Sequence, residues 1–197
     1  SCHLKGPVRV SIRAGAEPGV RAIAEDLAER LELAAGLSVT VEADQKNAQI
    51  RLRVAHGADG NKHQGKEGYE LKVNSEGAEI AGGGLDGLFY GCQTLLQCVQ
   101  QDEVNFSIRS VEIRDWPPYS FRAVQAWGKQ VQVPSTMSAI KVLARMKMDH
   151  ILLMGNDSQV LKAARELIKL RMESVPRCAD MPGAGWYSQS IEMYPGE

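Results

Sequence analysis

The residue types that most often carry chemistry are sparse in this sequence, and their spacing fits few common sites. Asp102 and Glu103 are adjacent acids, but they follow a predicted helix, so we interpret them as solvated charge in a turn. The four cysteines include no Cys-x-x-Cys pair, which argues against a zinc site. The run 82–84 is Gly-Gly-Gly, but it lacks the flanking residues of a phosphate-binding loop. We expect a flexible strand-to-helix connection there.

Composition and charge narrow the class of protein further. The chain has 197 residues, of which 44% are hydrophobic and 24% are charged, as in ordinary globular proteins. The net charge is −1, which gives no electrostatic reason to expect a nucleic-acid partner. We also expect no membrane span, no cofactor and no metal ion. Cys2, directly after Ser1, leaves a secreted, periplasmic or lipid-anchored location open.

The first part of the chain predicts strands and two amphipathic helices. Alternating apolar residues indicate a hairpin over 69–80, and apolar residues at helical spacing predict helices over 20–33 and 84–99. The second helix has an apolar stripe that fits a sheet face. Further strands are predicted at 7–13, 38–43, 48–54 and 107–113. These elements together predict an α+β domain with both helices on one face of the sheet.

A change of pattern follows Asp115-Trp-Pro-Pro118, where two prolines interrupt strand pairing. We therefore predict a domain over 1–114, a linker over 115–118 and a second domain over 119–197. The second domain reads as strands at 120–127, 150–154 and 172–178, with helices from Pro134 and over 158–170. Such alternation is typical of a parallel sheet, open or closed into a barrel. The tail, 186–197, shows no periodicity and is expected to be loose.

Four stretches resemble β-N-acetylhexosaminidases of glycoside hydrolase family 20. GLDGLFYGCQTLLQCV (84–99) resembles a helix of the small domain that precedes the catalytic barrel, and VEIRDWPPYSFRAV (111–124) resembles the passage into the first barrel strand. LARMKMDHILLMGND (143–157) resembles the first barrel helix and second strand, and LRMESVPRCADMPGAGW (170–186) the third strand and its loop. The resemblance implies that the second domain is the first part of a (β/α)8 TIM barrel. α-Glucuronidases and O-GlcNAcase-like hydrolases resemble the chain in the same regions and stay open as alternatives.

The resemblance implies a set of residues that bind carbohydrate. Arg122 occupies the place of a family arginine that grips sugar hydroxyls, and Asp180 that of the third-strand aspartate. Asp157 falls near a family Asp pair, although it also suits a helix N-cap. Trp127 replaces a family aspartate and could stack on a sugar ring or lie in a core. Ala184 replaces a family histidine. We therefore expect either that the protein binds its substrate differently from typical family members or that its site is degenerate.

The family reaction implies groups that the sequence lacks. It is a retaining hydrolysis in which the substrate acetamide attacks the anomeric carbon, a Glu protonates the leaving oxygen, and an adjacent Asp orients the acetamide. That Asp-Glu pair follows the fourth barrel strand, whereas 119–197 suffices for three. We therefore expect the chain to be the N-terminal portion of a glycosidase that acts on N-acetylhexosamine-type or related sugars. We expect this truncated chain to be inactive alone, and its exposed barrel strands to favour self-association. The alternatives are a non-catalytic scaffold or a carbohydrate- or protein-binding module.

Overall fold

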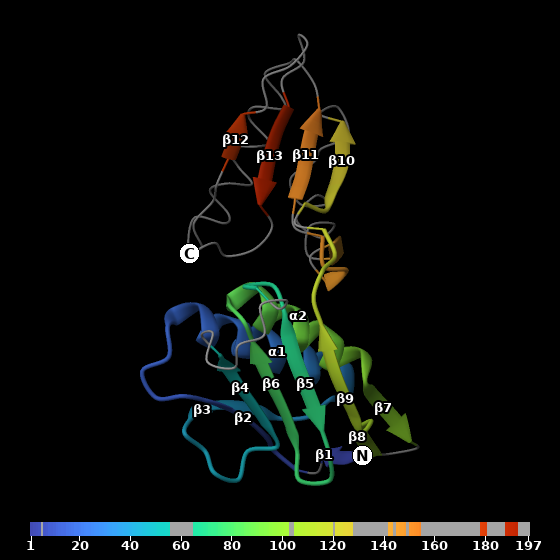
Figure 1. Ribbon diagram of the computed structural model, residues 1–197. Coiled ribbons are helices and arrows are strands. Elements are labelled where there is room, and N and C mark those ends of the chain that lie inside the picture. Colours follow the sequence, from blue (N-terminus) through green and yellow to red (C-terminus); the bar gives the residue numbers. More distant parts are fainter. Residues whose placement is uncertain are drawn as a thin grey trace. The chain divides into compact units, whose positions relative to one another are not determined.

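The computed structural model describes residues 1–4, 6–55, 65–102, 105–119, 121–127, 142–143, 145–148, 150–154, 178–180 and 188–192. It divides the chain into two compact units, Ser1–Pro117 and Pro118–Glu197 (Figure 1).

A six-stranded mixed sheet forms the centre of the first unit. Its strand order is β3-β2-β4-β6-β5-β9. The strands are β2 (Val8–Ile12), β3 (Val39–Ala43), β4 (Ile50–Val54), β5 (Tyr69–Val73), β6 (Ala78–Gly82) and β9 (Val111–Asp115). β2 runs parallel to β3 and β4, and β4 runs parallel to β6. β5 is antiparallel to β6 and β9, which confirms the predicted hairpin.

Two helices, α1 (Pro18–Ala35) and α2 (Leu85–Gln97), lie together on one face of this sheet (Figure 1). α1 begins at Pro18, whose missing N–H costs nothing in the first turn, and ends at Gly36 in the left-handed conformation. The prediction of two helices on one face is thus confirmed. The apolar stripe of α2 is only partly buried, because Leu88, Cys92 and Leu95 face the interior whereas Leu85 is half-exposed.

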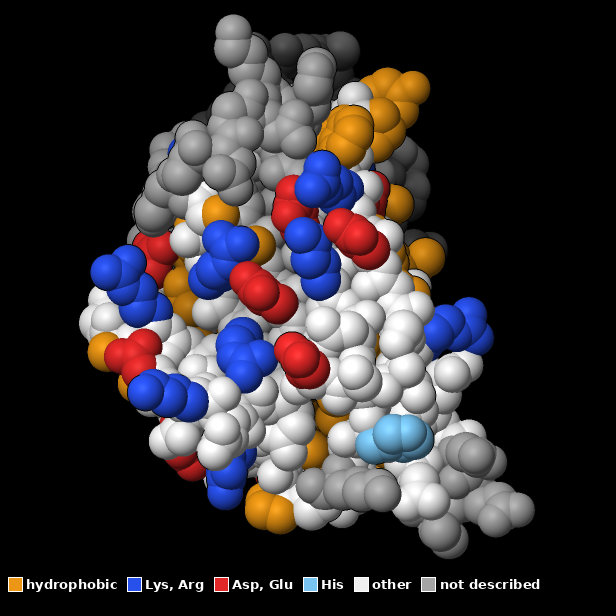
Figure 2. All heavy atoms as spheres, turned by 60° about the horizontal axis from the view of Figure 1, so that its bottom comes forward, with side chains coloured by type: hydrophobic (Ala, Val, Ile, Leu, Met, Phe, Trp, Pro, Cys, Tyr) orange, Lys and Arg blue, Asp and Glu red, His pale blue; other side chains and the backbone are white. Residues whose placement is uncertain are grey.

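The two faces of the sheet differ in chemistry because strand residues alternate between them. Val10, Ile50, Leu71 and Ile80 point to the helix side and are fully or almost fully buried. The other face carries cross-strand ion pairs that are largely solvated: Arg53–Glu79 at 2.8 Å, Arg114–Glu70 at 3.2 Å and Lys72–Glu112 at 3.6 Å. Figure 2 shows basic and acidic side chains interspersed, with neither sign gathered into a patch. Such a surface favours contact with water over an apolar partner.

A small antiparallel sheet completes the first unit, in the order β1-β8-β7. Its strands are β1 (Cys2–Leu4), β7 (Val99–Asp102) and β8 (Asn105–Ile108). The single strand predicted over 107–113 is therefore wrong, because the chain leaves β8 after Ile108 and enters β9 at Val111 in a different sheet. Asp102 ends β7, so the turn predicted for it is also wrong, and Glu103 lies outside the described residues.

The second unit contains a four-stranded sheet in the order β10-β11-β13-β12. β10 (Ala123–Trp127) and β11 (His150–Met154) are parallel neighbours, as predicted. β13 (Ser188–Glu192) lies antiparallel between β11 and β12 (Cys178–Asp180), so the purely parallel sheet and the loose tail are wrong for this strand. Its sequence, SQSIE, has one strongly apolar residue, and pairing on both sides rather than local pattern makes it a strand. Among the described residues, no helix has the length and apolar character needed to cross a bilayer.

Candidate functional site

Two predicted site residues lie at the end of the sheet where β10, β11 and β12 end, on strands that β11 and β13 separate. These three strands run in the same direction, because β13 is antiparallel to both β11 and β12. Trp127 is level with Met154, which is level with Ser188, and Asp180 is level with Gln189. The backbone thus places Trp127 and Asp180 at the same end of the sheet, where β10 and β12 finish. Asp157, which follows β11 in the sequence, lies outside the described residues.

Arg122 lies at the opposite end of β10, directly before its first residue. Trp127 is the fifth residue after Arg122, which corresponds to a span of roughly 16 Å along the strand. The Arg122 Nε donates to the carbonyl oxygen of Lys147 at 2.7 Å, and Nη1 donates to the carbonyl oxygen of Tyr119. The guanidinium therefore joins two backbone segments. The sugar-binding role of Arg122 stays a prediction. Arg122 and Trp127 lie at opposite ends of β10.

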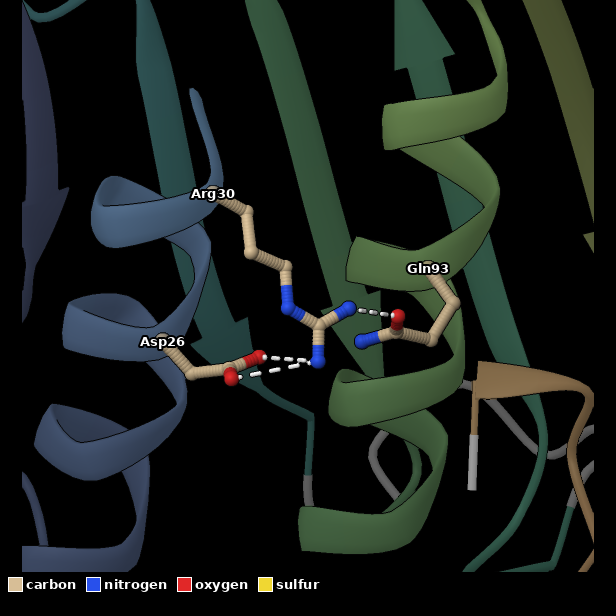
Figure 3. Close-up of polar contacts among 3 residues, drawn as sticks. All are labelled: Asp26, Arg30 and Gln93. Carbon is tan, nitrogen blue, oxygen red and sulfur yellow. Dashed lines mark hydrogen bonds and ion pairs between the residues drawn. The ribbon is translucent and has the colours of Figure 1, made fainter. Parts of the chain in front are cut away.

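In the first unit a polar cluster joins the two helices (Figure 3). Arg30 of α1 is mostly buried and contacts both carboxylate oxygens of Asp26, one turn earlier, at 3.0 and 3.1 Å. Its Nη1 donates to Oε1 of Gln93 on α2, a side chain that is itself buried. Sequence reasoning missed this cluster, although the i,i+4 spacing of Asp26 and Arg30 is a recognisable signal for an ion pair. The cluster is mostly buried at Arg30 and Gln93 and partly exposed at Asp26, and it links the two helices.

A second polar cluster links β5, α2 and β9. The Tyr69 hydroxyl lies 2.6 Å from Oγ1 of Thr94 and donates to Oδ2 of Asp115 at 3.0 Å. Tyr90 makes a similar contact elsewhere on α2, where its hydroxyl donates to Oε1 of Glu67 at 3.2 Å. Both tyrosine rings are buried, and in each case the hydroxyl reaches a carboxylate at the boundary of the core.

The Gly82-Gly-Gly84 run connects β6 to α2, as predicted, but it is closely packed rather than open. A Cβ atom on Gly83 would lie 2.0 Å from the carbonyl oxygen of Gly65, and one on Gly87 would lie 2.1 Å from that of Gly68. The N–H groups of Gly83 and Gly87 donate to the carbonyls of Gly68 and Lys66 at 2.8 and 3.0 Å. The segment therefore packs backbone against backbone, and the N–H groups of Gly83 and Gly87 are bonded to carbonyls rather than open to a phosphate.

Cys2, Cys92 and Cys98 are unsuited to nucleophilic chemistry. Burial raises the pKa of the Cys92 thiol well above its usual range; the Asp26 carboxylate raises it further, and Arg30 opposes the shift. Burial also raises the pKa of Cys2 and of Cys98, so the thiolate form is disfavoured at all three positions. Within the part of the chain that the structure describes, no cluster of His, Cys, Asp and Glu could hold a metal ion.

Comparison with known proteins identifies the relatives of this chain. The family described as glycosyl hydrolase family 20, domain 2, matches residues 2–116. A β-hexosaminidase of Porphyromonas gingivalis (strain ATCC BAA-308 / W83) is 30% identical over 110 residues, which cover 52% of this chain and 14% of that protein.

Solved structures with the same fold extend the likeness. The N-acetyl-β-hexosaminidase of Streptomyces plicatus has a TM-score of 0.66 and 24% identity, over 76% of this chain and 30% of that one. A family 20 exo-β-N-acetylglucosaminidase of Vibrio harveyi has a TM-score of 0.61 and 20% identity, over 75% of this chain and 22% of that one. The chain thus spans less than a third of these proteins, and the shared fold covers a larger part of it than residues 2–116.

Proposed function

Because the chain belongs to glycosyl hydrolase family 20, we propose that it is the N-terminal portion of a hydrolase acting on N-acetylhexosamine-type or related glycosides. The match to the domain 2 family over 2–116 carries this proposal. The likeness to solved hexosaminidases supports a second unit that is the first part of a TIM barrel, since it covers 76% of the chain. The strands of a TIM barrel are parallel, so the antiparallel strand β13 is the feature of the second unit that differs from the proposal.

The first unit suits a scaffold better than a catalytic domain. Its Arg30 and Tyr69 clusters bond within the unit, and its outer sheet face carries solvated ion pairs of both signs. Polar groups that bond to one another inside the unit make it rigid, and a rigid unit can hold neighbouring parts of a protein in place. A non-catalytic scaffold is therefore the second candidate function for this chain taken by itself.

The second unit supplies the residues proposed to contact sugar. Trp127 and Asp180 stand at the edge where three parallel-running strands end, and active sites of TIM barrels occur at that edge. An indole ring suits the C–H face of a pyranose, and a carboxylate accepts hydrogen bonds from hydroxyls. Asp157 follows β11 and is proposed for the same edge. The Asp-Glu pair of the family reaction is proposed to be absent from this chain.

Hydrolysis of an aryl N-acetyl-β-glucosaminide tests the proposal. We expect no turnover by the 197-residue chain, and turnover by the complete polypeptide encoded by its gene. In that polypeptide, Trp127→Ala and Asp180→Asn should each lower kcat/KM by about tenfold or more, the loss expected for a hydrogen bond or stacking contact made to substrate. Glu112→Gln on the outer sheet face is the control and should change nothing. Turnover by the 197-residue chain alone would contradict the absence of the catalytic pair.

The role of Arg122 needs a separate readout, because its guanidinium bonds to two carbonyls. If it also grips sugar, Arg122→Ala raises KM as well as lowering Tm. If it joins the Tyr119 and Lys147 segments alone, the same variant lowers Tm with KM unchanged.

A further inference from the structure

We propose that the Tyr69 hydroxyl is a clamp that holds the start of the inter-unit linker against α2. The predicted linker, 115–118, begins at Asp115, which is also the last residue of β9, so the chain leaves the sheet at Trp116. Asp115 is paired with Tyr69, the first residue of β5, at the end of the ladder between these strands. Ends of ladders open readily, so an extra bond at this position has more effect than one in the middle.

The Tyr69 ring is held in one position by the structure around it. The ring is buried, with 2% of the residue exposed, and Tyr69 is also paired with Gly82 on β6. A Cβ atom on Gly91 of α2 would come within 3.1 Å of the ring, so the helix backbone passes directly beside it. A tyrosine has two side-chain torsions, and packing fixes both, so its hydroxyl is delivered to a defined point.

At that point the hydroxyl connects a helix to the linker. It lies 2.6 Å from Thr94 Oγ1 on α2 and donates to Asp115 Oδ2 at 3.0 Å. Since the one phenolic proton goes to Asp115, the Thr94 hydroxyl is left to donate to the phenolic oxygen or to the carbonyl of Tyr90, 3.1 Å away. The bond to Asp115 has a charged acceptor, which makes it stronger than a neutral one.

The two prolines that follow Asp115 restrict the direction in which the chain continues. Pro117 and Pro118 have φ locked near −65°, and each restricts the residue before it to extended geometry. A stiff segment that leaves an anchored residue keeps its direction, whereas the same segment leaving a frayed strand end would not. The clamp therefore makes the order of the linker depend on the core of the first unit.

Hydrogen exchange of the 197-residue chain tests the clamp. Tyr69→Phe removes the hydroxyl and keeps the ring, so we expect the amides within 115–119 to exchange roughly tenfold faster. These amides belong to Asp115, Trp116 and Tyr119, because Pro117 and Pro118 carry no N–H. The amides of α1, which does not touch the clamp, should exchange as before. Asp115→Ala should give the same pattern. Asp115→Asn should give a smaller effect, because the amide oxygen still accepts a bond.

Tyr90→Phe is the matched control, since it also removes the hydroxyl of a buried tyrosine on the same core that bonds to a carboxylate. It should alter exchange near Glu67 and leave 115–119 unchanged. The proposal is overturned if Tyr69→Phe leaves 115–119 unchanged, or if Tyr90→Phe speeds these amides equally. Should Tyr69→Phe fail to fold, the two Asp115 variants decide: exchange at 115–119 that stays unchanged in both overturns the clamp.

Discussion

The two helices that cover the sheet of the first unit are held in different ways. α1 contacts its surroundings through long and medium side chains, among them the fully buried Leu27 and Leu31. α2 approaches through glycine: Gly87 lies against the backbone of Gly68, and Gly91 lies against Ile80 and Tyr69. When a side chain that positions a helix is substituted, the helix can shift slightly and repack. Where the helix backbone contacts another backbone segment, no flexible side chain lies between them to move aside.

The largest effect is expected where α1 is tested at its most buried leucine. Leu27→Ala should lower the free energy of unfolding by about 2–5 kcal/mol, because it removes apolar contacts and leaves a cavity. Urea unfolding followed by circular dichroism measures the change. Leu33 on the same helix is 79% exposed, so Leu33→Ala should have an effect near zero. Equal losses in both variants would show that side-chain burial does not hold α1.

The next effect concerns the backbone contact of α2. Gly87→Ala should cost about 1–3 kcal/mol, because the new Cβ would lie 2.1 Å from the carbonyl oxygen of Gly68, which cannot move without displacing its strand connection. Gly19→Ala on α1 meets only the tip of the Leu85 side chain, and alanine favours a helix, so its stability should change little. The same unfolding measurement separates the two. If Gly87→Ala proves neutral, the backbone contact does not fix α2.

A third effect, of about the same size as that of Gly87→Ala, concerns the ion pair where the two helices meet. Arg30→Ala should cost about 1–3 kcal/mol, because it leaves the buried Gln93 amide without the guanidinium that bonds it. Arg21 forms an i,i+4 pair with Glu25 on the same helix, but both side chains are at least half-exposed. Arg21→Ala should therefore cost less than about 0.5 kcal/mol. Thermal melts at low and high salt test this, and equal costs would mean that burial of Arg30 adds nothing.

Local patterns in the sequence predicted most elements of the first unit. The hairpin followed from the alternation of Tyr69, Leu71 and Val73, and both helices followed from apolar residues at helical spacing. The small sheet did not follow, because β1 and β8 are short and pair across about a hundred residues. Strands without a strong local pattern are specified by such distant partners, as β13 shows again in the second unit.

The functional residues were less accessible to sequence reasoning. Trp127 and Asp180 came from resemblance, and the strand directions place their backbones at one edge. The Tyr69 and Arg30 clusters had no signal beyond one helical ion-pair spacing, since they join residues far apart in the chain. Close packing at Gly83 and Gly87 was also invisible, because glycine suits a flexible loop and a tight backbone contact equally well.

The pairing of β1 with β8 has a consequence for the order in which the molecule is made. Cys2 is aligned with Ile108, so β1 leaves the ribosome long before its partner strand β8 does. Contacts between residues this distant are slow to form. The small sheet therefore forms late, and in a nascent chain arrested before residue 105 the strand β1 should be unpaired.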